Sequence, residues 1–127
     1  MSVPDNRPYF LNLVKIRLPL PGIISIFHRI SGVVLFLAIP FAVYLLDLSL
    51  QNDQGFRDAA ELLQQPLIKL LLLVLAWSII HHFYAGIRFL LIDFDIGVHK
   101  AASRIGAMLV IAAELLTLGI LLVSVYP

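Results

Sequence analysis

The chain has 127 residues, of which 61% are hydrophobic and 13% are charged, and its formal net charge is +1. A soluble domain needs roughly 25% charged residues to cover its surface, so this composition excludes a water-soluble fold. The absence of cysteine excludes disulfides, thiolate-bound zinc, iron–sulfur clusters and cysteine nucleophiles within the chain.

The N-terminal segment, residues 1–22, precedes the first long apolar run. It lacks the apolar core of about 7–15 residues and the small-residue cleavage site of a secretory signal, so we expect no removable leader here. Residues 9–18 mix apolar and basic side chains, and Pro19 and Pro21 then interrupt the chain. This amphipathic segment could lie along the cytoplasmic membrane surface, or equally well pack on a partner protein.

Three runs of the chain are long and apolar enough to cross a membrane, which requires about 20 mostly apolar residues in a helix. They extend over about residues 23–50, 66–92 and 105–126. No segment shows the apolar and polar alternation of a barrel strand. We therefore predict an all-α integral membrane protein whose single domain, residues 23–127, contains three transmembrane helices that run up and down.

Proline and turn residues subdivide this domain. Pro40 removes a backbone hydrogen bond inside the first span and predicts a bend there. Pro66 suits the first turn of the second span, where its missing N–H costs nothing. The loop 50–65 contains turn residues and then a short helical stretch, Phe56–Leu63. The second connection, Asp93–Ser103, is short and polar.

The distribution of charge predicts the orientation, because Lys and Arg favour cytoplasmic segments. Basic residues gather in the N-terminal segment, at the start of the first span and around the second connection: Arg7, Lys15, Arg17, Arg29, Arg88, Lys100 and Arg104. The first connection has two basic residues, Arg57 and, at its margin, Lys69, against four acidic ones in or beside it: Asp47, Asp53, Asp58 and Glu61. We predict a cytoplasmic N-terminus and a C-terminus on the opposite side.

Among the ionisable residues inside the predicted spans, we single out five, because burial there costs several kcal/mol and each requires a partner. They are His28, Arg29, His81, His82 and Glu114. The histidine pair precedes Asp93 by about 11 residues, which is roughly 16 Å along a helix and near the middle of a bilayer. Adjacent helical residues point about 100° apart, so at most one of the pair can ligate a given iron.

Two interpretations of the histidine pair remain open: a hydrogen-bonded core histidine, which is the commoner case, or an axial ligand. The geometry favours His82 as ligand, because small neighbours one turn away let a flat macrocycle or a partner helix approach closely. Those neighbours are Ser78, Ala85 and Gly86. His81 shares its side of the helix with bulkier or more polar residues.

The start of the first span carries a second polar group. Ser25, Arg29 and Gly32 fall one turn apart on nearly one face, with His28 beside them. A hydroxyl and a guanidinium so placed can donate hydrogen bonds to a carbonyl or carboxylate at the membrane boundary. The alternative is that Arg29 simply reaches to lipid phosphates, and the pattern alone favours that alternative.

Glu114 lies in the middle of the third span, where an unpaired carboxylate is expensive. We therefore expect it to be protonated or to face a polar partner inside the bundle, in a structural role.

Two of these stretches resemble signatures of a known family. Ser25-Ile-Phe-His28-Arg29-Ile-Ser-Gly32 resembles the S-x-x-H-R-x-[ST]-G signature of the cytochrome b membrane-anchor subunit of succinate dehydrogenase. The stretch from His82 through Gly86-Ile-Arg88 to Asp93 is similar to its H-x-x-x-G-I-R-H-x-x-x-D motif. The resemblance covers about residues 7–100, whereas the third span matches only in hydrophobicity.

The resemblance implies a membrane anchor in the respiratory chain and the tricarboxylic acid cycle. The chain would pack with a second, similar membrane-anchor subunit into a haem-binding helix bundle in the bacterial inner membrane, with its C-terminus in the periplasm. An iron–sulfur subunit and a flavoprotein subunit, which oxidises succinate, would dock on the cytoplasmic side. The complex would bind haem b and reduce ubiquinone; besides these proteins the expected partner is membrane lipid, not nucleic acid.

The resemblance also implies residue roles. His82 matches the axial ligand of the haem iron, the opposite ligand being a histidine of the sister subunit. Ser25 and Arg29 match quinone-binding residues. His28, Arg29 and Arg88 stand where haem propionates are met. The chain departs from the family at Phe89, where histidine is common, and Glu114 has no counterpart in the pattern.

Other functions remain as alternatives. An anchor of fumarate reductase, or of another haem-b quinone oxidoreductase, would share most of these features. A small proton channel or transporter that uses Glu114, His81 and Arg88 belongs to a different class.

Overall fold

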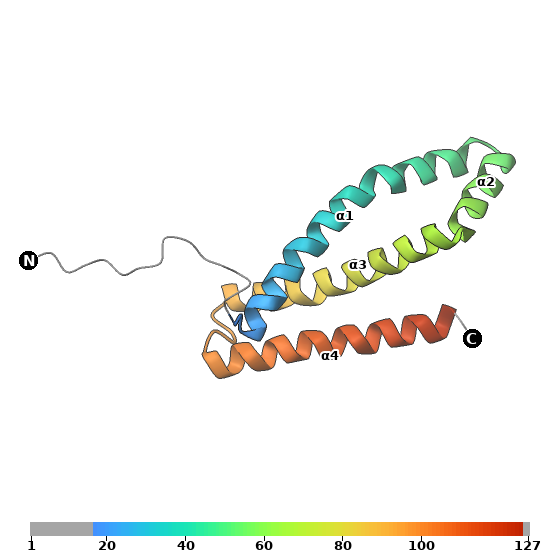
Figure 1. The fold of residues 1–127 in the computed structure, drawn as a ribbon. Helices are drawn as coiled ribbons and strands as arrows, with labels where there is room; N and C mark the ends of the chain where they lie inside the picture. The colour runs from blue at the N-terminus through green and yellow to red at the C-terminus, as the bar shows by residue number, and fades with distance from the viewer. Residues whose placement is uncertain (1–16, 126–127) are drawn as a thin grey trace, which may run out of the picture.

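The computed structural model describes residues 17–125, which form four α-helices (Figure 1). They are α1 (Leu20–Gln51), α2 (Asp53–Gln64), α3 (Pro66–Asp93) and α4 (Lys100–Val125). The helices α1, α3 and α4 are long and apolar enough to cross a membrane. The predicted all-α fold with three membrane-crossing helices is confirmed. The amphipathic N-terminal segment was predicted for residues 1–22, and residues 1–16 of it lie outside the described part of the chain.

Two helices begin earlier than the hydropathy indicates. Pro21, which was expected to interrupt the chain, lies in the first turn of α1, because a helix tolerates proline where no N–H is needed. The carbonyl of Pro19 accepts hydrogen bonds from the N–H groups of Gly22 and Ile23 at 2.8 and 3.2 Å. The start of α4 at Lys100 brings four residues of the predicted polar connection, 100–103, into the helix.

The short helix α2 folds back against the end of α1. The Asn52 side chain caps α2, since its Oδ1 accepts hydrogen bonds from the N–H groups of Gln54 and Gly55, both at 2.9 Å. Gly55 and Ala59 are buried in this contact. A side chain at Gly55 would collide with the Leu48 carbonyl oxygen. The helix expected over 56–63 is therefore present and longer at both ends.

The helices are arranged up and down (Figure 1). The start of α1, the end of α3 and the start of α4 lie together at one end, which we call the site end, and α2 lies at the other. The core of small and medium side chains packs at the site end: Ile24, Ala85, Ala107 and Val110. Beyond it α1, which contains Pro40, bows away from α3. An apolar cavity of about 240 Å³ lies between the two helices there.

We predict that Gly55→Ala destabilises the protein by about 1–3 kcal/mol, the usual effect of overpacking a close contact. The added methyl group has no space beside the Leu48 carbonyl. The measurement is the unfolding temperature in mild detergent. Gly119→Ala is the control, because a methyl group there meets nothing within 4 Å; equal unfolding temperatures of the two variants would contradict the prediction.

Candidate functional site

The contact between α1 and α3 is built from two His-x-x-x-Gly pairs. His28 and Gly32 lie one turn apart on α1, and His82 and Gly86 lie one turn apart on α3. Because the helices are antiparallel, each histidine meets the glycine of the other helix. A Cβ atom on Gly32 would lie 3.1 Å from His82 Cε1, and one on Gly86 would lie 3.7 Å from His28 Nε2. The glycines therefore provide the space for the two imidazole rings.

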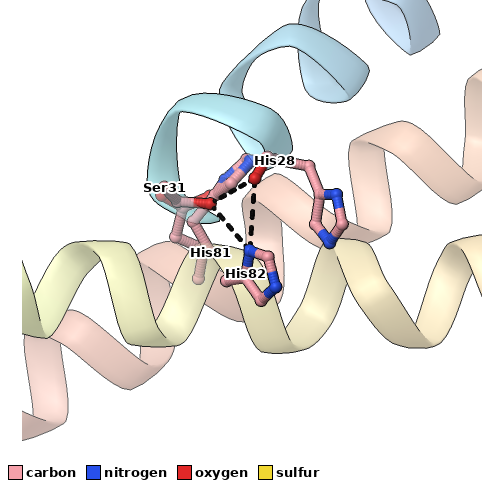
Figure 2. Close-up of polar contacts among 5 residues, drawn as sticks. His28, Ser31, His81 and His82 are labelled. Carbon is pink, nitrogen blue, oxygen red and sulfur yellow. Dashed lines mark hydrogen bonds and ion pairs between the residues drawn. The ribbon is translucent and has the colours of Figure 1, made fainter. Parts of the chain in front are cut away.

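The two rings themselves are stacked. Their centroids are 4.1 Å apart and their planes differ by 10°. Figure 2 shows His82 below the first turns of α1, with its Nδ1 atom directed at the α1 backbone. This atom lies 3.2 Å from the carbonyl oxygen of His28 and 3.2 Å from the hydroxyl oxygen of Ser31.

These contacts determine where the proton of His82 lies. A backbone carbonyl only accepts hydrogen bonds, so Nδ1 of His82 carries the hydrogen and donates it to His28. The Ser31 hydroxyl donates to the same carbonyl at 2.8 Å, which leaves its oxygen to accept from His82 Nδ1. A neutral imidazole protonated at Nδ1 presents the lone pair of Nε2. In this tautomer Nε2 of His82 carries the lone pair, and the hydrogen bonds of Nδ1 fix the orientation of the ring.

His81 faces a different part of the bundle. It is 2% exposed and its Nδ1 lies 2.9 Å from Oε2 of Glu114 on α4. Its ring stacks on Trp77 with centroids 5.4 Å apart, and Phe27 meets it edge-on at 6.1 Å. The Nε2 atom of His81 is buried and has no hydrogen-bond partner among the described residues. Contacts with all three long helices thus enclose this imidazole.

Arg88 also faces α4 and not the stacked histidines. It is 7% exposed, and its Nη2 donates to the Ser103 hydroxyl at 2.9 Å. Its guanidinium carbon lies 5.5 Å from the centre of the Phe89 ring, which in turn lies 5.0 Å from the His28 ring. The ring of Phe89 therefore lies between Arg88 and His28. Phe89 is the position at which the family signature described above commonly has histidine.

The remaining predicted site residues lie on α1 at the site end. Arg29 is exposed and Ser25 is half-buried. They lie one turn apart, so a small molecule bound at this helix could meet both. The structure therefore brings His28 and His82 into direct contact and places Ser25 and Arg29 beside them, whereas Arg88 is turned to α4.

Sequence reasoning missed two contacts. Ser31 was not singled out, although a hydroxyl three residues after His28 can reach its carbonyl and therefore the same His82 nitrogen. The partner of Glu114 was also not identified as His81. In the part of the chain from residue 17 to 125, no cluster of three or more His, Cys, Asp or Glu residues could hold a bare metal ion.

Comparisons with known proteins agree with this picture. Residues 4–121 match the family described as "Succinate dehydrogenase/Fumarate reductase transmembrane subunit". The chain is 34% identical over 114 residues to the succinate dehydrogenase cytochrome b556 subunit of Coxiella burnetii, a match covering 89% of this chain and 91% of that protein. It is 30% identical over 118 residues to the protein of the same name from Rickettsia felis, covering 92% of each chain.

We predict opposite effects of a methyl group at the two contact glycines. Gly32→Ala places the methyl group against His82, which is held by two hydrogen bonds and a ring stack, so we expect a loss of about 1–3 kcal/mol. Gly86→Ala makes an ordinary contact with His28 and gains up to about 1 kcal/mol of helix propensity. Unfolding temperatures in mild detergent compare the two; a more stable Gly32→Ala protein would refute the packing argument.

Proposed function

We propose that this chain, which belongs to the succinate dehydrogenase/fumarate reductase transmembrane subunit family, is the cytochrome b anchor of a succinate dehydrogenase. In this proposal His82 ligates the iron of haem b, and Ser25 and Arg29 form part of a ubiquinone-reducing site. The observation that carries the proposal is the hydrogen bond from His82 Nδ1 to the His28 carbonyl, which leaves Nε2 available.

The surroundings of His82 support haem ligation more than those of His81. A metal-bound histidine commonly donates its other ring N–H to a carbonyl or carboxylate, which fixes the ring and raises its basicity. Both histidines have such a partner. However, His82 is only half-buried, whereas Nε2 of His81 is enclosed by the chain's own helices. A macrocycle shared with a second subunit requires the accessible nitrogen.

The residues fit a haem whose second ligand comes from the sister anchor subunit. When bound, haem b with two histidine ligands supplies a one-electron carrier without an open position for oxygen. His28 stacks on His82 and keeps its ring in place. His28 and Arg29 are the proposed contacts of the haem propionates on α1. Arg88, the third proposed contact, would have to turn from Ser103 to reach them.

The proposed quinone site lies at the site end of α1. The Ser25 hydroxyl would donate a hydrogen bond to a quinone carbonyl. The exposed Arg29 guanidinium would stabilise the negative charge that develops on that oxygen during reduction. Water at the membrane boundary would supply the protons. The protein's contribution is thus to place a hydrophobic acceptor near an electron donor and not to oxidise succinate.

The proposed orientation puts the site end on the cytoplasmic side of the membrane. Basic residues of the described chain concentrate there: Arg17, Arg29, Arg88, Lys100 and Arg104. The other end carries the four acidic residues around α2, Asp47, Asp53, Asp58 and Glu61, against only Arg57 and Lys69. This asymmetry supports a bacterial inner-membrane protein whose C-terminus is periplasmic. The iron–sulfur and flavoprotein subunits would then dock over the site end.

A fumarate reductase anchor is the second candidate, because the family description covers both enzymes. The quinone extracted with the purified complex distinguishes them, with menaquinone favouring the second. A proton channel is less well supported. His81 and Glu114 bind each other, and Arg88 binds Ser103, so these side chains pack the bundle and do not line an aqueous path.

We predict that His82→Ala eliminates the haem absorption band from the purified complex. His81→Gln is the matched control, because glutamine can still donate a hydrogen bond to Glu114 but is a poor haem ligand. We expect this control to keep the haem band at wild-type intensity. Loss of haem in His81→Gln together with retention in His82→Ala would reverse the ligand assignment.

We further predict that Ser25→Ala lowers succinate:quinone reductase activity, by as much as about 10²–10³-fold, the upper range for loss of a donor to developing charge. Arg29→Leu should lower it further. Succinate oxidation with a soluble artificial acceptor, assayed on the same membranes, should be unaffected by either substitution.

The quinone reductase assay and the artificial-acceptor assay together distinguish a lost quinone site from failed assembly. Wild-type quinone reduction in both variants would remove Ser25 and Arg29 from the quinone site. A parallel loss of both activities would indicate failed assembly, and the amount of flavoprotein bound to the membranes measures assembly directly.

A further inference from the structure

The hydrogen bond between His81 and Glu114 joins α3 to α4 deep inside the bundle. His81 is 2% exposed and Glu114 is 8% exposed, and their atoms are 2.9 Å apart. Leaving either polar group without a partner inside an apolar bundle is energetically unfavourable. This cost makes the contact a strong constraint on how α3 can rotate about its axis.

The neighbours of His81 reinforce that constraint. Trp77, one turn earlier on α3, stacks on one face of the imidazole with planes 26° apart. Phe27 of α1 meets the ring edge-on. The side chain is therefore held by α1, α3 and α4 together, and its direction is fixed.

Fixing His81 also fixes the direction of His82, because adjacent residues of a rigid helix point about 100° apart. An imidazole ring lies about 6 Å from its helix axis, so a rotation of about 20° displaces it by about 2 Å. Such a displacement would break the 3.2 Å contact of His82 Nδ1 with the His28 carbonyl. The same rotation of α3 about its axis therefore places His81 against Glu114 and Nδ1 of His82 against the His28 carbonyl.

We infer that Glu114 is a positioning residue: by binding His81 it sets the rotation of α3 and thereby the orientation in which His82 presents Nε2 to the iron. The inference rests on the proposed function of His82 as haem ligand. Glu114 itself touches neither the haem nor the quinone in this role, and it acts only through His81.

The test compares the wild-type complex with three variants, all purified in mild detergent. Glu114→Leu removes the acceptor and keeps apolar bulk, whereas Glu114→Gln keeps an acceptor oxygen. Thr117→Val is the matched control, since it removes the hydrogen bond of 2.8 Å between Tyr84 of α3 and Thr117 of α4, one turn along α4. The readout is the electron paramagnetic resonance spectrum of the oxidised haem, in which the largest g value depends on the angle between the two ligand imidazole planes.

We expect Glu114→Leu to keep its haem but to shift or broaden the largest g value beyond the variation among wild-type preparations. Glu114→Gln and Thr117→Val should give the wild-type spectrum. An unchanged spectrum in Glu114→Leu would overturn the inference. An equal shift in Thr117→Val would also overturn it, because any loosening between α3 and α4 would then suffice.

If the Glu114→Leu complex does not assemble, a double variant provides the test. His81→Leu/Glu114→Leu removes both polar groups at once, so neither is left buried without a partner, and replacing a buried polar pair by apolar residues of similar volume is often tolerated. The inference requires a shifted haem signal in this variant, and a wild-type signal contradicts it. A wild-type complex without a bis-histidine haem signal would instead refute the proposed function, so the two failures are distinguishable.

Discussion

A histidine on a helix that is apolar enough to cross a membrane requires a partner for its N–H group and space for its ring, and the contact between α1 and α3 supplies both. The carbonyl of His28 accepts the hydrogen bond from His82, while Gly32 leaves space for the ring. In return, Gly86 of α3 leaves space for the ring of His28. The His28 carbonyl also accepts from the Ser31 hydroxyl of its own helix, so the additional bond from His82 demands a close approach of the two helices. The position of α1 against α3 follows from this requirement.

The rest of the fold is arranged around α3, which carries polar groups on two sides. One side presents His82 to α1, and the other presents a buried row of residues to α4. In that row His81 binds Glu114 and Arg88 binds Ser103. Each of these polar side chains has a partner, although the Nε2 atom of His81 and the Nε atom of Arg88 are buried without one among the described residues. The two sides are coupled, because a rigid α3 can form its hydrogen bonds to α1 and to α4 together at only one rotation about its axis. Among residues 17–125, no hydrogen bond between side chains joins α1 to α3 beyond the site end, where α1 bows away (Figure 1).

This arrangement suits a protein whose contribution is placement. The groups proposed to act on haem and quinone come from the first turns of α1 and the middle of α3, where packing is tightest. Their precision is provided by hydrogen bonds that are themselves not part of the chemistry, such as those of Ser31 and Glu114. The large apolar surface left exposed on the long helices is consistent with lipid and with a second anchor subunit as neighbours.

The sequence by itself determined the membrane class, the three long helices and the two groups of polar residues, because these depend on composition, on the length of apolar runs and on local spacing. It placed helix ends less well, since hydropathy does not register a proline in the first turn of a helix or a lysine at its start, as Pro21 in α1 and Lys100 in α4 show. Only the tertiary structure decided which histidine faces which helix. The partners of His82 and His81 are 51–54 and 33 residues away in the chain. No local pattern specifies such contacts, because they depend on the rotation of one helix against two others.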